Sequence, residues 1–154
     1  IRYPRGSAHQ GLQEYQAPVE YGRSEIIRKG KKIAVLGVGS MIPSCMEICK
    51  GLKDDGYDPT FVNARFVKPL DVDLLDELAK DHSLFVTVEE KSGGYGEHVS
   101  AYMEACHPEI RVLSAAVWDR FVPQGNVESL RSRIGLGVED IRQAIEDSEE
   151  LREQ

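Results

Sequence analysis

The feature that most constrains the fold is a regular alternation of short apolar runs with helical patterns. Residues 32–38 (KIAVLGV) form an almost continuous apolar run, which is typical of a strand covered on both faces. Apolar residues then recur every three or four positions from Met41 to Leu52, the spacing of one helix face. The same alternation returns along the chain, with further strands predicted at 60–63 (TFVN), 84–88 (LFVTV) and 110–117 (IRVLSAAV).

Strands that alternate with helices predict a mostly parallel sheet with helices on both of its faces. Residues 21–28 (YGRSEIIR) form a leading strand, and the turn 29–31 joins it to the next strand without a crossover helix. We therefore expect this leading strand to run antiparallel to its successor. The predicted fold class is α/β, a three-layer α/β/α sandwich, which two short helices around 127–134 and 138–145 complete.

The chain is predicted to consist of one domain with two flanking segments. Residues 1–20 have neither a helical nor a strand period, so we predict an extended lead-in or interdomain linker there. Residues 21–148 form the predicted domain, and the acidic residues 149–154 are predicted to fray. Because the sequence opens abruptly on the charged stretch IRYPRG, we expect it to be part of something larger.

Composition and charge argue against several classes of partner. The chain has 154 residues, with 26 Asp and Glu against 19 Lys and Arg, and this formal charge of −7 disfavours binding to nucleic-acid phosphates. No apolar run approaches the roughly 18 residues of a membrane span, so we predict no membrane partner. The three cysteines, Cys45, Cys49 and Cys106, are an odd and sparse set, which favours a reducing cytoplasm and core packing over metal binding.

A glycine-rich turn, Gly37-Val38-Gly39-Ser40, follows the first buried strand and opens a helix, with Ser40 placed to cap it. Free backbone N–H groups at such a point can receive an anion. The third glycine of a dinucleotide-binding motif would fall at position 42, where this chain has Ile42. The sequence therefore favours a tight turn, and a nucleotide or regulatory anion stays an alternative.

Glu89 and Glu90 follow the predicted strand 84–88, at the end where open α/β sheets usually place ligands. Paired carboxylates there can serve as general acid and base, or they can form ion pairs at a domain or subunit contact. No histidine or nucleophile lies at a neighbouring strand end, so we favour the contact interpretation. The histidines are predicted to be a first-turn helix residue (His98), solvated turn residues (His82 and His107) and a mobile residue of the lead-in (His9).

An arginine loop, Arg2-Tyr3-Pro4-Arg5-Gly6, opens the chain. Proline stiffens this loop, and arginine grips phosphate well because its planar guanidinium donates two parallel charged hydrogen bonds. A surface turn with solvated charges explains the same residues equally well. No strand end offers a Ser–His–Asp or Cys–His arrangement, so we assign no catalytic residue and predict that this chain is part of a catalyst.

Four segments of the chain occur in a telling order and spacing: 1–6 (IRYPRG), 64–71 (ARFVKPLD), 86–90 (VTVEE) and 121–125 (FVPQG). They resemble the C-terminal domain of the 1-deoxy-D-xylulose-5-phosphate synthases, within the thiamine-diphosphate-dependent transketolase family. The likeness extends over essentially the whole chain. It implies a five-stranded, mostly parallel sheet with one antiparallel strand in the α/β/α sandwich.

The resemblance also implies a function. In the parent enzyme the N-terminal and central domains would bind thiamine diphosphate and Mg²⁺, so no cofactor is expected in this chain, and the isolated chain is expected to be inactive. The parent would condense pyruvate with D-glyceraldehyde 3-phosphate, with loss of CO₂, for isoprenoid and thiamine biosynthesis. This domain would support a cytoplasmic homodimer, with Glu89 and Glu90 as possible interface residues. Arg5 would contact the phosphate of the aldehyde.

Two segments depart from the family pattern. Residues 91–98 (KSGGYGEH) are shorter than the Ala- and Gly-rich segment that often follows V-E-E, and residues 115–120 (AAVWDR) replace a Gly-hydrophobic-Pro-Asp stretch. Two alternatives therefore stay open. One is the C-terminal domain or subunit of another transketolase-like or 2-oxoacid dehydrogenase enzyme, and the other is a nucleotide- or anion-binding regulatory module.

Overall fold

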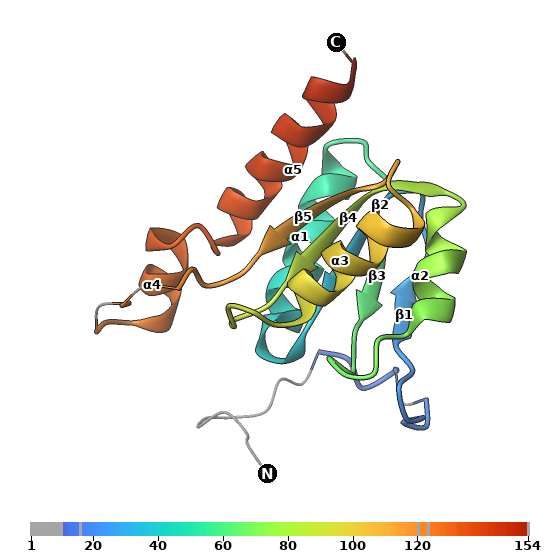
Figure 1. Cartoon of the computed structure of the whole chain (residues 1–154). Helices are drawn as coiled ribbons and strands as arrows, with labels where there is room; N and C mark the ends of the chain where they lie inside the picture. The colour runs from blue at the N-terminus through green and yellow to red at the C-terminus, as the bar shows by residue number, and fades with distance from the viewer. Residues whose placement is uncertain (1–10, 16, 120, 123, 154) are drawn as a thin grey trace.

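The computed structural model describes residues 11–15, 17–119, 121–122 and 124–153, and a five-stranded sheet lies at its centre (Figure 1). The strands are β1 (Glu25–Arg28), β2 (Lys32–Gly37), β3 (Thr60–Asn63), β4 (His82–Val88) and β5 (Arg111–Ala115). Their order is β1-β3-β2-β4-β5, and only β1 runs antiparallel to its neighbour. The mostly parallel sheet with one antiparallel strand is thus confirmed.

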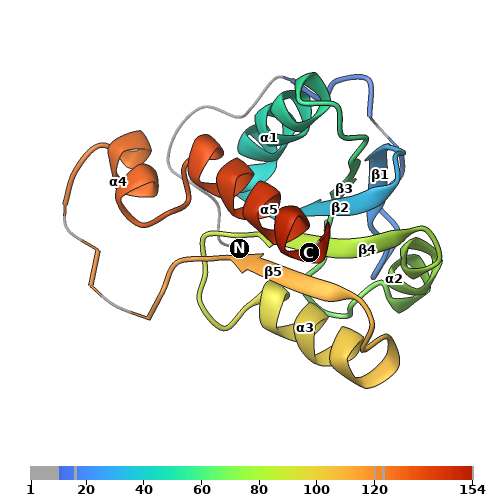
Figure 2. The same ribbon diagram turned by 90° about the horizontal axis from the view of Figure 1, so that it is seen from above.

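Helices cover both faces of this sheet. They are α1 (Ile42–Asp54), which follows the short 3₁₀ turn η1 (Gly39–Met41), then α2 (Val72–Ala79), α3 (Tyr95–Cys106), α4 (Val127–Arg133) and α5 (Val138–Glu153). α1 and α5 lie on one face, and α2 and α3 lie on the other (Figure 2). This arrangement is the predicted three-layer α/β/α sandwich. α5 continues well beyond Ile145, where the helical pattern of the sequence ends.

The central strands are apolar throughout because both of their faces are buried. In β2, Ile33 and Val35 point toward α1 and α5, whereas Ala34 and Leu36 point toward α2 and α3. None of these four side chains is more than 1% exposed. Burial of one such large aliphatic side chain contributes at most about 1.5–3 kcal/mol, so the two clusters supply the main driving force for folding.

The leading strand does not pair with its successor. β1 is antiparallel to β3, with Ile26 opposite Val62, and β3 lies between β1 and β2. The turn that links β1 to β2 is held on the loop before β3, because the Lys31 N–H donates to the Asp58 carbonyl (2.6 Å). β1 is thus antiparallel to β2, as predicted. The two strands do not form a hairpin, because β3 lies between them.

His82 lies inside the protein, so the prediction of a solvated turn residue was wrong. Its ring nitrogen Nδ1 lies 2.8 Å from the Leu78 carbonyl and its Nε2 lies 2.7 Å from Thr60 Oγ1. Because a carbonyl oxygen only accepts hydrogen bonds, Nδ1 of His82 carries the proton. The Thr60 hydroxyl therefore donates to Nε2, and it accepts the Gly30 N–H. Burial lowers the pKa of His82, against the opposing effects of the Leu78 hydrogen bond and the Asp81 charge.

The remaining histidines and cysteines of the described residues differ in burial. His98 lies in the first turn of α3, as predicted, and His107 is partly buried against Asp76, with 2.8 Å between Nε2 and Oδ1. Cys45 and Cys49 are buried in the α1 face, which confirms core packing, whereas Cys106 is exposed. His9 lies outside the described residues. No helix within the described part of the chain is both long and apolar enough to cross a membrane.

Candidate functional site

The carboxyl ends of the four parallel strands meet at one edge of the sheet, which we call the carboxyl edge. β2 ends there at Gly37, β3 at Asn63, β4 at Val88 and β5 at Ala115. The glycine-rich turn follows β2, and the two glutamates follow β4. Open parallel sheets usually bind ligands at this edge, so the predicted site should lie here.

Glu89 is a buried carboxylate that caps α3 from outside the helix. Glu89 is only 3% exposed. Its Oε1 accepts the backbone N–H of Gly96 in the first turn of α3 (2.7 Å). A negative charge at a helix N-terminus is stabilised by the unpaired N–H groups and the helix dipole. A Cβ on Gly94 would lie 2.1 Å from Glu89 Oε2, which explains the glycine there. Glu89 is therefore a structural group in this chain.

A second buried carboxylate, Asp71, caps α2 on the same edge. It accepts the backbone N–H of Ser24 (2.7 Å) and a hydrogen bond from the Arg23 guanidinium (3.0 Å). Tyr95, which is 2% exposed, lies near both carboxylates. Burial, followed by the charges of Asp71 and Glu89, raises the pKa of the Tyr95 hydroxyl. This part of the carboxyl edge is thus filled by packed, hydrogen-bonded side chains.

Glu90 turns away from Glu89 and forms an ion pair with α4. Arg131 donates from both Nε (2.9 Å) and Nη2 (2.5 Å) to Glu90 Oε1, and the Ser40 hydroxyl donates to Oε2. Burial acts to raise the pKa of Glu90, but the hydrogen bonds from Ser40 and Arg131, together with the Arg131 charge, outweigh burial and lower it. Through this carboxylate, the turn after β2, the end of β4 and the helix α4 are joined.

The glycine-rich turn is a close-packed connection. A Cβ on Gly37 would lie 2.8 Å from Cys45 Sγ, so the glycine lets α1 approach β2, and Gly39 has a positive φ of 56°. Ser40 makes no capping hydrogen bond; its hydroxyl is taken by Glu90, so the predicted cap was wrong. These observations favour the tight-turn interpretation of the sequence.

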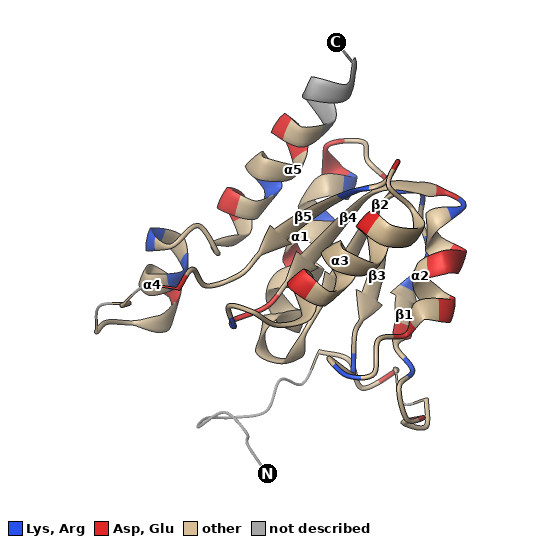
Figure 3. Ribbon diagram, viewed as in Figure 1, with Lys and Arg blue, Asp and Glu red and all other residues tan. Residues whose placement is uncertain are grey.

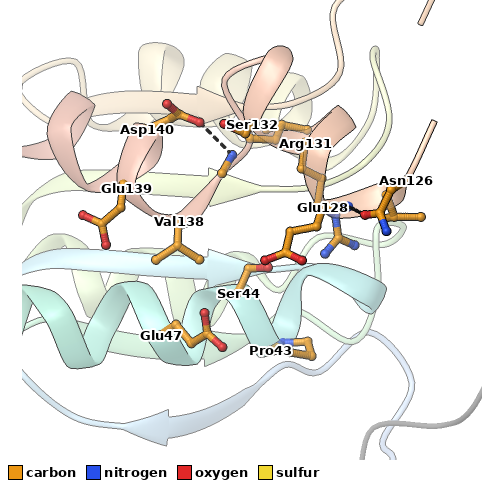
Figure 4. Close-up of a pocket in the computed structure, with 13 residues that line it drawn as sticks. Pro43, Ser44, Glu47, Asn126, Glu128, Arg131, Ser132, Val138, Glu139 and Asp140 are labelled. Carbon is orange, nitrogen blue, oxygen red and sulfur yellow. Dashed lines mark hydrogen bonds between the residues drawn. The ribbon is translucent and has the colours of Figure 1, made fainter. Parts of the chain in front are cut away.

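A cavity of about 690 Å³ lies beside Glu90, between α1, α4 and α5 (Figure 4). Its charged lining consists of Glu47, Glu128, Arg131, Glu139 and Asp140. Four carboxylates and one guanidinium therefore line this cavity, and Glu90 already neutralises the guanidinium, so the lining disfavours phosphate or another anion. No group of three or more metal-ligating side chains comes together in the part of the chain that the structure describes. This lining does not fit the diphosphate group of thiamine diphosphate.

The structure separates the predicted site residues. Glu89 and Glu90 lie at the predicted strand end, but their carboxylates bind different elements and do not form an acid–base pair. Arg5 lies outside the described residues. The sequence reasoning missed Arg131, because its partner is 41 residues away and neither residue belongs to a recognisable motif.

The comparison with protein families decides what kind of domain this is. A family model described as "Transketolase, C-terminal domain" matches residues 22–141. The chain belongs to the transketolase C-terminal domain family. Membership of this family agrees with the mixed sheet and with the two helical layers that surround it.

Curated relatives of this transketolase C-terminal domain confirm the finer resemblance. The 1-deoxy-D-xylulose-5-phosphate synthase of Lachnoclostridium phytofermentans is 38% identical over 144 residues, which cover 92% of this chain and 23% of the relative. The enzyme of the same name from Chlorobaculum tepidum is 39% identical over 144 residues, again 92% of this chain and 23% of the relative. The chain therefore spans about a quarter of the length of these relatives.

A solved structure shows the same domain. A split-gene transketolase, described as an inactive β4 tetramer, matches with a TM-score of 0.79 and 29% sequence identity. The match covers 85% of this chain and 43% of that chain. This match confirms the predicted fold class.

Proposed function

We propose that this chain is the C-terminal domain of a 1-deoxy-D-xylulose-5-phosphate synthase, an enzyme that condenses pyruvate with D-glyceraldehyde 3-phosphate and releases CO₂. The observation that carries the proposal is the 38–39% identity with synthases over 92% of the chain. In such an enzyme, thiamine diphosphate and Mg²⁺ are held by the other domains. The acidic cavity described above agrees with that division, because it disfavours a diphosphate.

This division of labour makes the domain a support for a cytoplasmic homodimer and for the domains that precede it. We assign Glu90 to that contact region, and the buried Glu89 supports the region from within because it holds the start of α3. Glu90 keeps 39% of its side chain exposed while it holds Arg131, so a partner surface can still reach it. Such a partly exposed charge is typical of the polar rim of an interface.

The test of the parent's activity uses two proteins. The parent enzyme, supplied with pyruvate, D-glyceraldehyde 3-phosphate, thiamine diphosphate and Mg²⁺, should release CO₂ and form the five-carbon product. The isolated 154-residue chain should release none under the same conditions. Turnover by the isolated chain would contradict the proposal. So would a parent enzyme that forms no product from D-glyceraldehyde 3-phosphate.

We also propose that Arg5 binds the phosphate of the aldehyde substrate. In the parent, Arg5→Ala should raise the KM for D-glyceraldehyde 3-phosphate by the equivalent of about 1.5–3 kcal/mol, the usual contribution of a hydrogen bond to a charged group. The KM for pyruvate should stay the same. Arg2→Ala, in the same loop, is the matched control and should leave both constants unchanged. Equal effects of the two substitutions would contradict a specific role for Arg5.

A second candidate is a split transketolase-like enzyme with different substrates. The match to the split-gene transketolase, at 29% identity and a TM-score of 0.79, favours it. Release of ¹⁴CO₂ from carboxyl-labelled pyruvate distinguishes the two candidates, because a transketolase takes its two-carbon unit from a ketose phosphate without loss of CO₂. Ketose-dependent transfer without CO₂ release would select this second candidate.

A further inference from the structure

Large apolar side chains gather on the connection between β5 and α4. Trp118 is 70% exposed, Phe121 is fully exposed, and Val122 and Val127 are 38% and 61% exposed. We call these four residues the β5–α4 surface. Figure 1 shows this connection and α4 projecting beyond the sheet, away from its two helical layers. Large apolar side chains that are exposed along one short segment of the chain indicate a contact surface.

An apolar groove continues this surface toward the core. It has a volume of about 300 Å³ and runs from Trp118 along β5 to Ile134, Leu136, Ile141 and Ala144. Ile141 and Leu136 belong to the buried cluster of the α1 and α5 face, so the groove joins the exposed side chains to the core of the domain. A partner that inserts an apolar side chain here would therefore bury area on both sides of the contact.

The helix α4 is held in place by polar contacts. None of its residues is buried, and the Arg131–Glu90 ion pair ties it to the end of β4. At its N-terminus the Asn126 side chain accepts the Glu128 N–H (2.9 Å). Charged residues are spread over the helices of the whole domain (Figure 3). The apolar side chains of the β5–α4 surface thus lack the burial within this chain that would offset their exposure to water.

The path of the preceding chain indicates what covers this surface. Arg65, just after β3, donates to the carbonyls of Ala17 and Pro18 (both 3.2 Å), which fixes this part of the lead-in at the carboxyl edge. Leu12 then packs against the cluster on the α1 and α5 face. The β5–α4 surface follows the end of β5, at the same edge. The polypeptide therefore reaches this domain on the edge that carries the exposed apolar residues.

We propose that the β5–α4 surface docks on the preceding catalytic domains of the same polypeptide. This assignment rests on the proposed function, in which about three-quarters of the enzyme lies outside this chain. The lead-in brings those domains to the carboxyl edge, so the contact forms within one molecule and its effective concentration is high. A second copy of the domain is the competing occupant, and the test separates it by its dependence on concentration.

The test measures hydrogen–deuterium exchange of residues 116–127 by mass spectrometry in the parent and in the 154-residue chain. We expect these amides to exchange at least about tenfold more slowly in the parent, because docking removes local opening. Phe121→Ser combined with Val122→Ser should restore fast exchange in the parent. Val72→Ser is the matched control, since Val72 on α2 is also 38% exposed, and it should leave the protection unchanged.

Trp118 gives a second measurement, because it is the one tryptophan among the 154 residues. In the 154-residue chain its fluorescence should be that of a water-exposed indole at every protein concentration. A blue shift that grows with concentration would mean that a second copy covers the surface, and it would overturn the choice of occupant. Equally fast exchange of residues 116–127 in both proteins would overturn the docking itself.

The two proposals fail separately. A parent that turns over pyruvate and D-glyceraldehyde 3-phosphate, yet leaves residues 116–127 unprotected, refutes the docking surface and keeps the function. A parent that protects these residues but lacks the synthase reaction refutes the function, and it keeps the contact.

Discussion

Arg131 on α4 donates two hydrogen bonds to the same oxygen of Glu90, the second residue after β4. This ion pair joins a helix without buried side chains to the chain just after β4. The two side chains are 24% and 39% exposed, so solvent screens part of their attraction. The contact therefore positions α4 more than it stabilises the domain.

The first prediction concerns Glu90 and acid. Glu90→Gln should reduce the free energy of unfolding by about 1 kcal/mol at pH 7, the scale of a partly exposed ion pair. Because the folded-state pKa of Glu90 is lowered, its contribution is complete above the ordinary value of 4.5 and is lost as the pH falls through the folded-state pKa. Urea unfolding at pH 7 and in acid measures both values. A difference that stays constant into acid would contradict the ion pair, and Arg133→Gln on the same helix is the control.

The second prediction concerns the buried carboxylate of Glu89. Glu89→Ala should lower the free energy of unfolding by about 1–3 kcal/mol, because the buried Gly96 N–H loses its acceptor at the start of α3. Glu97→Ala, an exposed substitution in the first turn of the same helix, should stay within about 0.5 kcal/mol. Denaturant unfolding followed by circular dichroism measures both variants. Equal losses would show that Glu89 adds nothing beyond an ordinary surface charge.

A third prediction follows from the neutral state of His82. Its folded-state pKa lies below 6.5, so as the pH falls the unfolded chain binds a proton at His82 before the folded protein does. The stability that His82 contributes is complete above about pH 6.5 and is lost as the pH falls through the folded-state pKa. Between pH 7.5 and 5.5, the wild-type protein should lose more stability than His82→Gln does. Parallel pH profiles of the two proteins would contradict this assignment.

The fourth prediction concerns the three thiols. Burial raises the pKa of Cys49 to about 12, against the opposing charge of Arg28, and burial also raises the pKa of Cys45, with a further increase from the Cys49 charge. At pH 8 a disulfide reagent should therefore modify Cys106 rapidly and the other two only as the protein unfolds. Cys106→Ser should abolish the rapid phase. Two rapidly reacting thiols in the native wild-type protein would contradict the burial.

The elements that the sequence predicted well are those with a local signal. The apolar run of β2 and the helical spacing of α1 follow from the residues themselves, because period and burial are encoded within one segment. The Asp71 cap of α2 is local in the same sense, since Asp71 and the Leu74 N–H that it accepts lie three residues apart. The family resemblance rested on four such short segments.

The features that the sequence did not predict depend on partners far along the chain. β1 pairs with β3 rather than β2, Ser40 bonds to Glu90 rather than to its own helix, and Arg131 completes that cluster. The folded sheet brings these partners together, although they lie far apart in the sequence. Residue spacing within a single sequence carries no information on such pairs, so they became visible only in the fold.

The insertion of β3 between β1 and β2 has a consequence for how this domain assembles. Gly30 passes so close to the loop before β3 that a Cβ there would lie 2.1 Å from the Asp58 carbonyl oxygen. On the ribosome, residues 25–28 emerge before β2 and α1, yet their hydrogen-bonding neighbour β3 is made only after these two elements. β1 can therefore join the edge of the sheet only after β3 has been synthesised and has paired with β2.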